Sequence, residues 1–326
     1  MIRFFAAIAA VFVSTVVAAQ EAEPESIQLP FDIEMGKTLT LNTTLTQEEG
    51  GARLVATETA ELTPLKVDGD KVLYRYKTTG ADLVSAEGMP PFMLPLLEKM
   101  AAESKGLSFE YAADATGYPD TLTKYKRITK FMQGVGQDLV EWAKKYAVSE
   151  GLTGQQATIL AGAIQQSIAP YMTEDVDSLS RLVLEEGQII FSATARTMYP
   201  GYYSQSKGTR FFLPGNAYFY TDDNWALESY DEDAGQAVIT WDSTLHPQEY
   251  EAFLTRYHAN LTEENGPEMA EAIETEINKY RNLKLTRTGR YTIDLSNGLP
   301  GEGSVRSETI WEGNTEVETI DFTLNY

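Results

Sequence analysis

The 326-residue chain contains no cysteine and only two histidines, His246 and His258. The lack of cysteine excludes disulfides, thiolate nucleophiles, iron–sulfur clusters and cysteine-based zinc sites. The two histidines lie twelve positions apart, which is not the spacing of a helical zinc motif such as H-E-x-x-H. We therefore expect neither a metal centre nor a cofactor.

The sequence also lacks the short motifs of several common enzyme classes. It has no G-x-S-x-G nucleophile elbow, no phosphate-binding P-loop and no G-x-G-x-x-G dinucleotide turn. Basic residues are in the minority, with 26 Lys and Arg against 48 Asp and Glu, which gives a net charge of −22. Such a chain repels phosphate backbones and anionic membrane surfaces. The sequence therefore favours a non-enzymatic protein that binds no nucleic acid and assigns no catalytic residue.

Residues 1–19 carry the pattern of an export signal. Arg3 provides a positive charge, an apolar stretch from Phe4 to Val17 follows, and small residues end the segment at Ala19. The apolar stretch is short for a membrane-spanning helix, and acidic residues come soon after it. We expect cleavage after Ala19 and a mature protein that is exported, either to the periplasm or out of the cell, without stable membrane insertion.

The rest of the chain divides into strand-rich and helix-rich stretches. Residues 20–35 are a polar lead-in that we expect to be flexible. Residues 36–127 alternate apolar and polar side chains, which predicts a first β-rich half. Residues 128–186 carry apolar side chains at spacings of three and four and predict a helical segment. Residues 187–326 predict a second β-rich half with a helical insertion at 246–280, so the fold class is α+β with helices packed on one face of curved antiparallel sheets.

A weak internal repeat relates the two β-rich halves. The segment D-x-x-G-Y-P at 114–119 is echoed by D-x-x-x-G-L-P at 294–300. Each segment follows alternating apolar residues and precedes another strand, so both predict hairpin turns in which Gly117 and Gly298 adopt a positive φ. The repeat predicts two related halves that form a half-barrel or a barrel.

These turns and the W-x-S-T-L-x-P segment at 241–247 resemble a family of exported bacterial proteins of unknown function, in which curved antiparallel sheets carry helical insertions. At the level of architecture alone, the arrangement is similar to periplasmic lipoprotein carriers, whose half-barrel wraps an acyl chain around a helical plug. The resemblance implies a fold. It carries over no functional residue, because turn motifs specify shape.

The most unusual stretch is 199–225, which holds nine aromatic residues interrupted by proline and glycine. Aromatic side chains on loops above a sheet suit stacking on sugars, peptide binding or the mouth of an apolar site. Alternatively, alternate aromatics fill the core. Arg210 would pair with an anionic headgroup or with one of the many acids. The predicted ligand-binding residues are Tyr199, Tyr202, Tyr203, Arg210, Phe212, Tyr218, Tyr220 and Trp225.

Three functional hypotheses follow. The leading one is an exported non-enzymatic protein that binds an apolar small molecule, a glycan or an envelope protein through the aromatic stretch. The second is a glycosidase-type hydrolase of envelope or extracellular polymers, which needs two carboxylates roughly 5–10 Å apart in one cleft, taken from Glu228, Asp231 and Asp233. The third is a structural or assembly-assisting envelope protein that interacts through its sheet edges.

Overall fold

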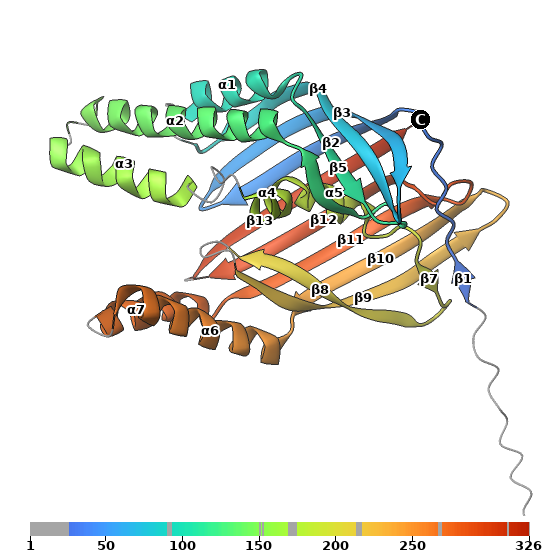
Figure 1. The fold of residues 1–326 in the computed structure, drawn as a ribbon. Helices are drawn as coiled ribbons and strands as arrows, with labels where there is room; N and C mark the ends of the chain where they lie inside the picture. The colour runs from blue at the N-terminus through green and yellow to red at the C-terminus, as the bar shows by residue number, and fades with distance from the viewer. Residues whose placement is uncertain are drawn as a thin grey trace, which may run out of the picture.

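Eleven strands form one antiparallel sheet in the computed structural model (Figure 1). The structure describes residues 26–89, 93–149, 151, 153–168, 175–212, 217–266, 269–311 and 313–325, so the predicted export signal lies outside the described residues. The strands of the sheet are β2 (Leu39–Glu49), β3 (Ala52–Asp68), β4 (Lys71–Glu87), β5 (Ser108–Ala113), β6 (Pro119–Lys124), β8 (Tyr203–Phe212), β9 (Ala217–Asp231), β10 (Gln236–Leu245), β11 (Lys284–Asp294), β12 (Pro300–Trp311) and β13 (Asn314–Asn325).

The sheet is curved and open. Its strand order is β6-β5-β4-β3-β2-β13-β12-β11-β10-β9-β8, with β6 and β8 at the two edges. Neighbouring strands follow one another along the chain except at the centre, where β2 pairs with β13 and Glu49 lies opposite Glu316. The two β-rich stretches therefore form a single sheet, and the predicted α+β class is confirmed.

Seven helices accompany the sheet in the described part of the chain. They are α1 (Leu94–Ser104), α2 (Lys126–Ser149), α3 (Gly154–Ile168), α4 (Val176–Val183), α5 (Glu185–Phe191), α6 (Pro247–Asn265) and α7 (Ala270–Tyr280). Thr153 and Gln156 bond reciprocally at the start of α3, where they form a capping box. Figure 1 shows α4 and α5 within the hollow of the sheet, where they are positioned to shape any internal site.

Helix α5 is a correction to the sequence analysis, which predicted strand structure from residue 187 onward. The helix continues to Phe191, and strands resume only at β7 (Thr197–Met198), which pairs with β1 (Ile27–Gln28). The apolar run Ile189 to Phe191 is buried on all sides, and burial on all sides removes the periodicity that separates helix from strand. Short buried segments of this kind are set by their tertiary contacts.

The main hydrophobic core lies between α5 and the middle and second half of the sheet. Ile190 on α5 and Tyr291 on β11 are both fully buried, and Trp225 on β9 is 1% exposed. Two further clusters lie under α6–α7 and under α2 and α4. The helices therefore cover both halves of the sheet with separate apolar contacts.

The two repeated turns have matching geometry. Gly117 and Gly298 have φ values of 81° and 74°, as their positions predict. In each turn the leading aspartate, Asp114 or Asp294, accepts the backbone N–H two residues later at 2.8 Å. The glycine N–H then bonds to the aspartate carbonyl. Both turns are thus Asx-type turns closed by a left-handed glycine.

The described part of the lead-in packs against these turns. Leu29 is 1% exposed and its N–H donates to the carbonyl of Arg196, while the N–H of Asp32 donates to the carbonyl of Asn297. A Cβ at Gly298 would lie 1.6 Å from the carbonyl oxygen of Pro30. The segment after β1 is therefore fixed to the body of the protein, where the sequence predicted flexibility.

No helix in the described ranges is both long and apolar enough to cross a membrane.

Candidate functional site

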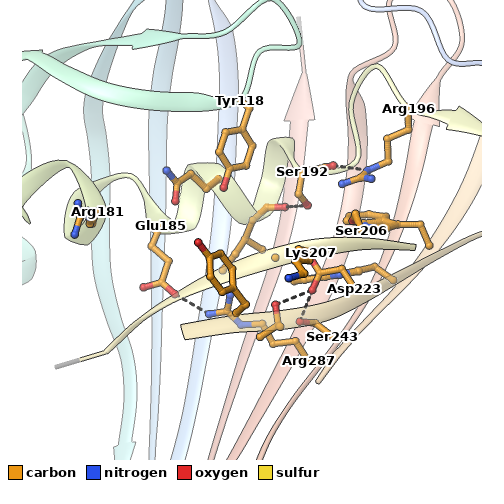
Figure 2. Close-up of a pocket in the computed structure, with 17 residues that line it drawn as sticks. Tyr118, Arg181, Glu185, Ser192, Arg196, Ser206, Lys207, Asp223, Ser243 and Arg287 are labelled. Carbon is orange, nitrogen blue, oxygen red and sulfur yellow. Dashed lines mark hydrogen bonds and ion pairs between the residues drawn. The ribbon is translucent and has the colours of Figure 1, made fainter. Parts of the chain in front are cut away.

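Two cavities lie on opposite sides of the α4–α5 helix pair. The larger, of about 640 Å³, lies between this pair and strands β8 to β11 (Figure 2). The smaller, of about 290 Å³, lies between the same pair, α2 and strands β2 to β5. The helix pair therefore serves as a shared wall, and the residues on its two sides decide what each cavity can hold.

The larger cavity is lined by four basic and two acidic side chains, and we call it the cationic cavity. These charged residues are Arg181, Glu185, Arg196, Lys207, Asp223 and Arg287. The smaller cavity is walled mostly by aliphatic and aromatic side chains, and we call it the apolar cavity. Its wall includes Leu41, Leu62, Leu107, Phe109, Phe131 and Met132, and it also contains Glu58 and Glu186.

Arg287 is the most deeply buried charge of the cationic cavity. Its side chain is 7% exposed, and one terminal nitrogen donates to Glu185 Oε1 at 2.8 Å. Its Nε donates to Ser307 Oγ at 2.8 Å. Burial lowers the pKa of Arg287, while the charge of Glu185 opposes that change. This arginine is therefore held by the protein itself (Figure 2).

Arg196 lies on the other side of the cationic cavity, on the segment that follows α5 (Figure 2). Its guanidinium carbon is 3.5 Å from the ring centroid of Trp225, which is a cation–π contact. Its Nε donates to the carbonyl of Ser192 at 2.7 Å. Burial lowers the pKa of Arg196 to about 10, so the side chain stays charged at neutral pH. Trp225 thus supports a cation at the cavity wall.

Asp223 is the buried acid of the cationic cavity. Its Oδ1 accepts hydrogen bonds from Thr221 Oγ1 at 2.9 Å and Ser243 Oγ at 2.7 Å. Burial raises the pKa of Asp223, and these bonds and the charge of Arg196 oppose the shift. A Cβ at Gly208 would lie 2.5 Å from the Asp223 carboxylate, so only glycine leaves room for this side chain.

The acids of the apolar cavity have a different environment. Glu58 Oε1 accepts hydrogen bonds from the Tyr76 hydroxyl at 2.6 Å and from Thr78 Oγ1 at 3.0 Å. Burial, and then the charge of Glu58, raises the pKa of Glu186 from its usual 4.5 to about 7, although a hydrogen bond with Thr43 opposes the shift. At neutral pH the Glu186 carboxyl is therefore about half protonated.

The structure separates the predicted ligand-binding residues into three groups. Tyr199, Tyr202 and Tyr203 are exposed at and before the start of β8, at 39%, 58% and 71%. Tyr220 and Trp225 line the cationic cavity. The side chains of Arg210, Phe212 and Tyr218 lie outside the described ones. The aromatic stretch thus does not form one surface, and its role in binding stays a prediction.

Trp225 serves the core as well as the cavity wall. It is 1% exposed and its ring stacks on Trp241 with centroids 5.3 Å apart. Strand alternation explains this, because Trp225 lies opposite Trp241 in the β9–β10 pairing. The reading in which alternate aromatics fill the core therefore applies to this residue.

The acids of the hydrolase hypothesis lie away from both cavities. Glu228 is exposed and accepts two hydrogen bonds from Arg290, at 2.9 and 3.0 Å, which lower its pKa. Asp231 is exposed at the end of β9, and Asp233 is exposed in the turn that follows it. Within the described ranges, no group of three or more His, Asp or Glu side chains could hold a metal ion. Glu228, Asp231 and Asp233 therefore line neither of the two cavities, although the hydrolase hypothesis needs two carboxylates in one cleft.

Sequence reasoning did not single out Arg196 or Arg287 as site residues, whereas Asp223 lies in the acidic cluster from which the hydrolase hypothesis was drawn. A signal for Arg287 exists in the sequence, because it occupies the same alternating face of β11 as the buried Leu285 and Tyr291. A basic residue on an apolar strand face indicates a buried charge that needs a partner. Arg196 carries no comparable signal, since it lies in an irregular segment.

Comparisons with known proteins give no family. A scan against protein-family models found no match, and neither did a search of the curated proteins. Among solved structures, one chain with a similar course comes from a structure of lipid–protein interactions in lipovitellin, at 7% identity and a TM-score of 0.40. The alignment covers 90% of this chain and 26% of that one, so the chain spans about a quarter of the length of lipovitellin's chain.

Proposed function

We propose that the protein is a non-enzymatic binder of a small apolar molecule, and that the ligand occupies the apolar cavity. The observation that carries this proposal is the composition of the cavity wall, in which aliphatic and aromatic side chains from the sheet face apolar side chains from helix α2. The export signal predicted at residues 1–19 would place this activity outside the cytoplasm.

The sheet side of the cavity is a rigid apolar surface. Leu62 is 1% exposed, Phe109 is 7% exposed and stacks on Tyr76 with ring centroids 4.9 Å apart. Transfer of apolar surface from water into such a wall contributes roughly 25 cal/mol per Å². The cavity of about 290 Å³ is near the lower end of small-molecule pockets, which span roughly 300–1,000 Å³. A ligand of modest size fits this space.

The helical side is supplied by the apolar stripe of α2. Ile128, Phe131 and Met132 all line the cavity, at the spacings that predicted this helix from the sequence. Ile128 is 5% exposed, whereas Phe131 and Met132 are only partly buried. The flexible side chain of a methionine at such a position adapts to ligands of different shape. This side is therefore where the cavity can adjust to a ligand.

The experiment is a titration with the neutral apolar dye 1-N-phenylnaphthylamine, whose fluorescence rises in an apolar site. We expect the purified protein to bind the dye with saturation. Met132→Trp places a larger side chain in the cavity and should abolish saturable binding. Val148→Trp is the matched control, because Val148 lies on the same helix and is 73% exposed. It should bind the dye like the unaltered protein.

Circular dichroism and thermal unfolding establish that each variant is folded. Should Met132→Trp not fold, Phe131→Ala tests the same wall by widening the cavity, and it should change the dye affinity while Val148→Trp does not. An unaltered protein without saturable binding would contradict the proposal. Equal binding by the Met132 and Val148 variants would contradict it as well.

A further inference from the structure

We propose that the cationic cavity is a second binding site, for a small polar anion that carries a carboxylate or phosphate group together with hydroxyl groups, and that Arg196 is its main contact. A sugar acid and a sugar phosphate both have this chemistry. The proposal is independent of the apolar ligand, because the two cavities lie on opposite sides of α4–α5.

The charge of the cavity is the reverse of that of the chain. Acidic residues outnumber basic ones by 48 to 26 in the sequence, yet basic side chains outnumber acidic ones by four to two in this wall. Glu185, one of the two acids, is bonded to Arg287. Lys207 pairs with Glu249, which lies outside the wall, so the excess of positive charge rests on the arginines. A local concentration of positive charge within an acidic protein attracts small anions into that cavity.

Arg196 has a positive charge without a counter-charge in contact. Its Nε is bonded to the carbonyl of Ser192, but no described residue accepts a hydrogen bond from its two terminal nitrogens or forms an ion pair with it. Partly buried guanidinium groups are normally paired, and a carboxylate or phosphate pairs with their two parallel N–H groups. A bound anion would supply the partner that the protein does not.

The backbone holds Arg196 in place at the cost of local strain. Ala195, the preceding residue, has a φ of 52° and is the one non-glycine residue with a positive φ in the described chain. The segment is fixed by the Gln28 side chain, which donates to the Ala195 carbonyl at 3.1 Å, and by Leu29, whose N–H donates to the Arg196 carbonyl at 2.9 Å. Such strain concentrates at binding sites.

The remaining wall suits hydroxyl groups better than an alkyl chain. The side chains of Tyr118, Tyr220 and Ser206 line the cavity, and Asp223 provides carboxylate oxygens that can accept hydrogen bonds from a ligand hydroxyl. With a volume of about 640 Å³ the cavity has room for a monosaccharide derivative. The combination of a cation on one side and an acceptor on the other selects a polar anion over a fatty acid.

The test is isothermal titration calorimetry of the full protein with glucuronate and with glucose 6-phosphate, beside neutral glucose and dodecanoate. We expect at least one sugar anion to bind clearly more tightly than glucose, and more weakly as salt rises from about 0.05 to about 0.5 M. A preference between the two identifies the carboxylate or the phosphate as the natural group. Failure of both to bind at up to about 10 mM in low salt overturns the proposal. The proposal is also overturned if dodecanoate is the only anion whose binding requires Arg196. That result would assign the cavity to a lipid headgroup.

Variants identify the contact. Arg196→Gln should weaken the sugar anion by about tenfold or more, because it removes a charge-assisted hydrogen bond. Lys207→Gln should weaken it several-fold. Its side chain is 59% exposed, so this variant tests the site even where Arg196→Gln fails to fold. Arg306→Gln is the matched control, since Arg306 is exposed and pairs with Glu308 outside the cavity. Unchanged affinity in both the Arg196 and Lys207 variants contradicts the proposal.

The two proposals fail separately. The Arg196→Gln variant should bind 1-N-phenylnaphthylamine with the affinity of the unaltered protein. The Met132→Trp variant should likewise bind the sugar anion with unaltered affinity. Loss of both ligands in either variant would mean that one connected site, and not two, lies beneath α4–α5, which overturns the independence stated above.

Discussion

The two cavities share a sheet and a helix pair, yet the acidic side chains in their walls have opposite electrostatic environments. Glu185 and Glu186 are adjacent in the sequence and face different cavities. Glu185 meets Arg287 at 2.8 Å. Glu186 is buried near a second acid, Glu58, with one hydroxyl partner, Thr43, and its pKa rises to about 7. The difference shows that the direction of a side chain on a short helix decides whether a carboxylate strengthens a polar site or is neutralised in an apolar one.

The largest loss of stability should come from removing a side chain that belongs both to the core and to the wall of the cationic cavity. Trp225→Ala removes a side chain that is 1% exposed and stacked on Trp241. We expect the free energy of unfolding to fall by about 3–5 kcal/mol. Urea denaturation measures this loss. A loss below about 1 kcal/mol would mean that Trp225 is not the core residue that its burial indicates.

Glu186→Gln should stabilise the protein at alkaline pH. Because the folded-state pKa of about 7 is above the unfolded value of 4.5, the carboxyl is protonated without penalty below about pH 4.5 and destabilises the fold progressively as pH rises through 7. At pH 8 the variant should be more stable by about 3 kcal/mol, and the gain should vanish near pH 4.5. The measurement is urea denaturation across this range. A gain that does not depend on pH would contradict the shifted pKa.

Glu185→Gln, one position earlier, should have the opposite sign. It leaves the 7% exposed Arg287 without its charged partner, so we expect a loss of about 1–3 kcal/mol at pH 7. Glu308→Gln is the control and should have little effect, because its partner Arg306 is 49% exposed and stays solvated without the ion pair. If the free energy of unfolding falls for Glu185→Gln and rises for Glu186→Gln, the contrast between the two cavities is demonstrated directly. Equal signs would refute it.

The smallest effect should come from the exposed tyrosines. Tyr202→Ser and Tyr203→Ser alter side chains that are 58% and 71% exposed, so the free energy of unfolding should change by no more than about 0.5 kcal/mol. The same variants test the predicted binding role of this stretch, because any loss of ligand or partner binding would then be free of a folding defect. A large loss of stability would indicate contacts that the exposure does not show.

Much of the fold could be predicted from alternation and turn chemistry. Gly117, Gly298 and the apolar stripe of α2 gave correct local structure because each depends on neighbouring residues alone. Helix α5 could not be predicted, since its apolar residues are buried on every side. The pairing of β2 with β13 also has no local signal, because it depends on how the two halves meet.

The candidate site was predictable only in part. The aromatic stretch led to Tyr220 and Trp225, which do line a cavity. It gave no indication of Arg196, whose position depends on Gln28 and Leu29, more than 160 residues earlier in the chain. Charge counting over the whole sequence concealed the cationic cavity as well, because the average is acidic and only the fold gathers the basic side chains.

The pairing of β2 with β13 has a consequence for folding. The two central strands are the first and last strands of the sheet along the chain, so the sheet remains in two pieces until the final residues are available. Contacts between such distant residues form slowly, because a long loop must close first. A chain cut before β13 would present the unpaired edges of β2 and β12, and exposed edges of this kind promote aggregation. Completion of the sheet therefore depends on β13, the last strand along the chain.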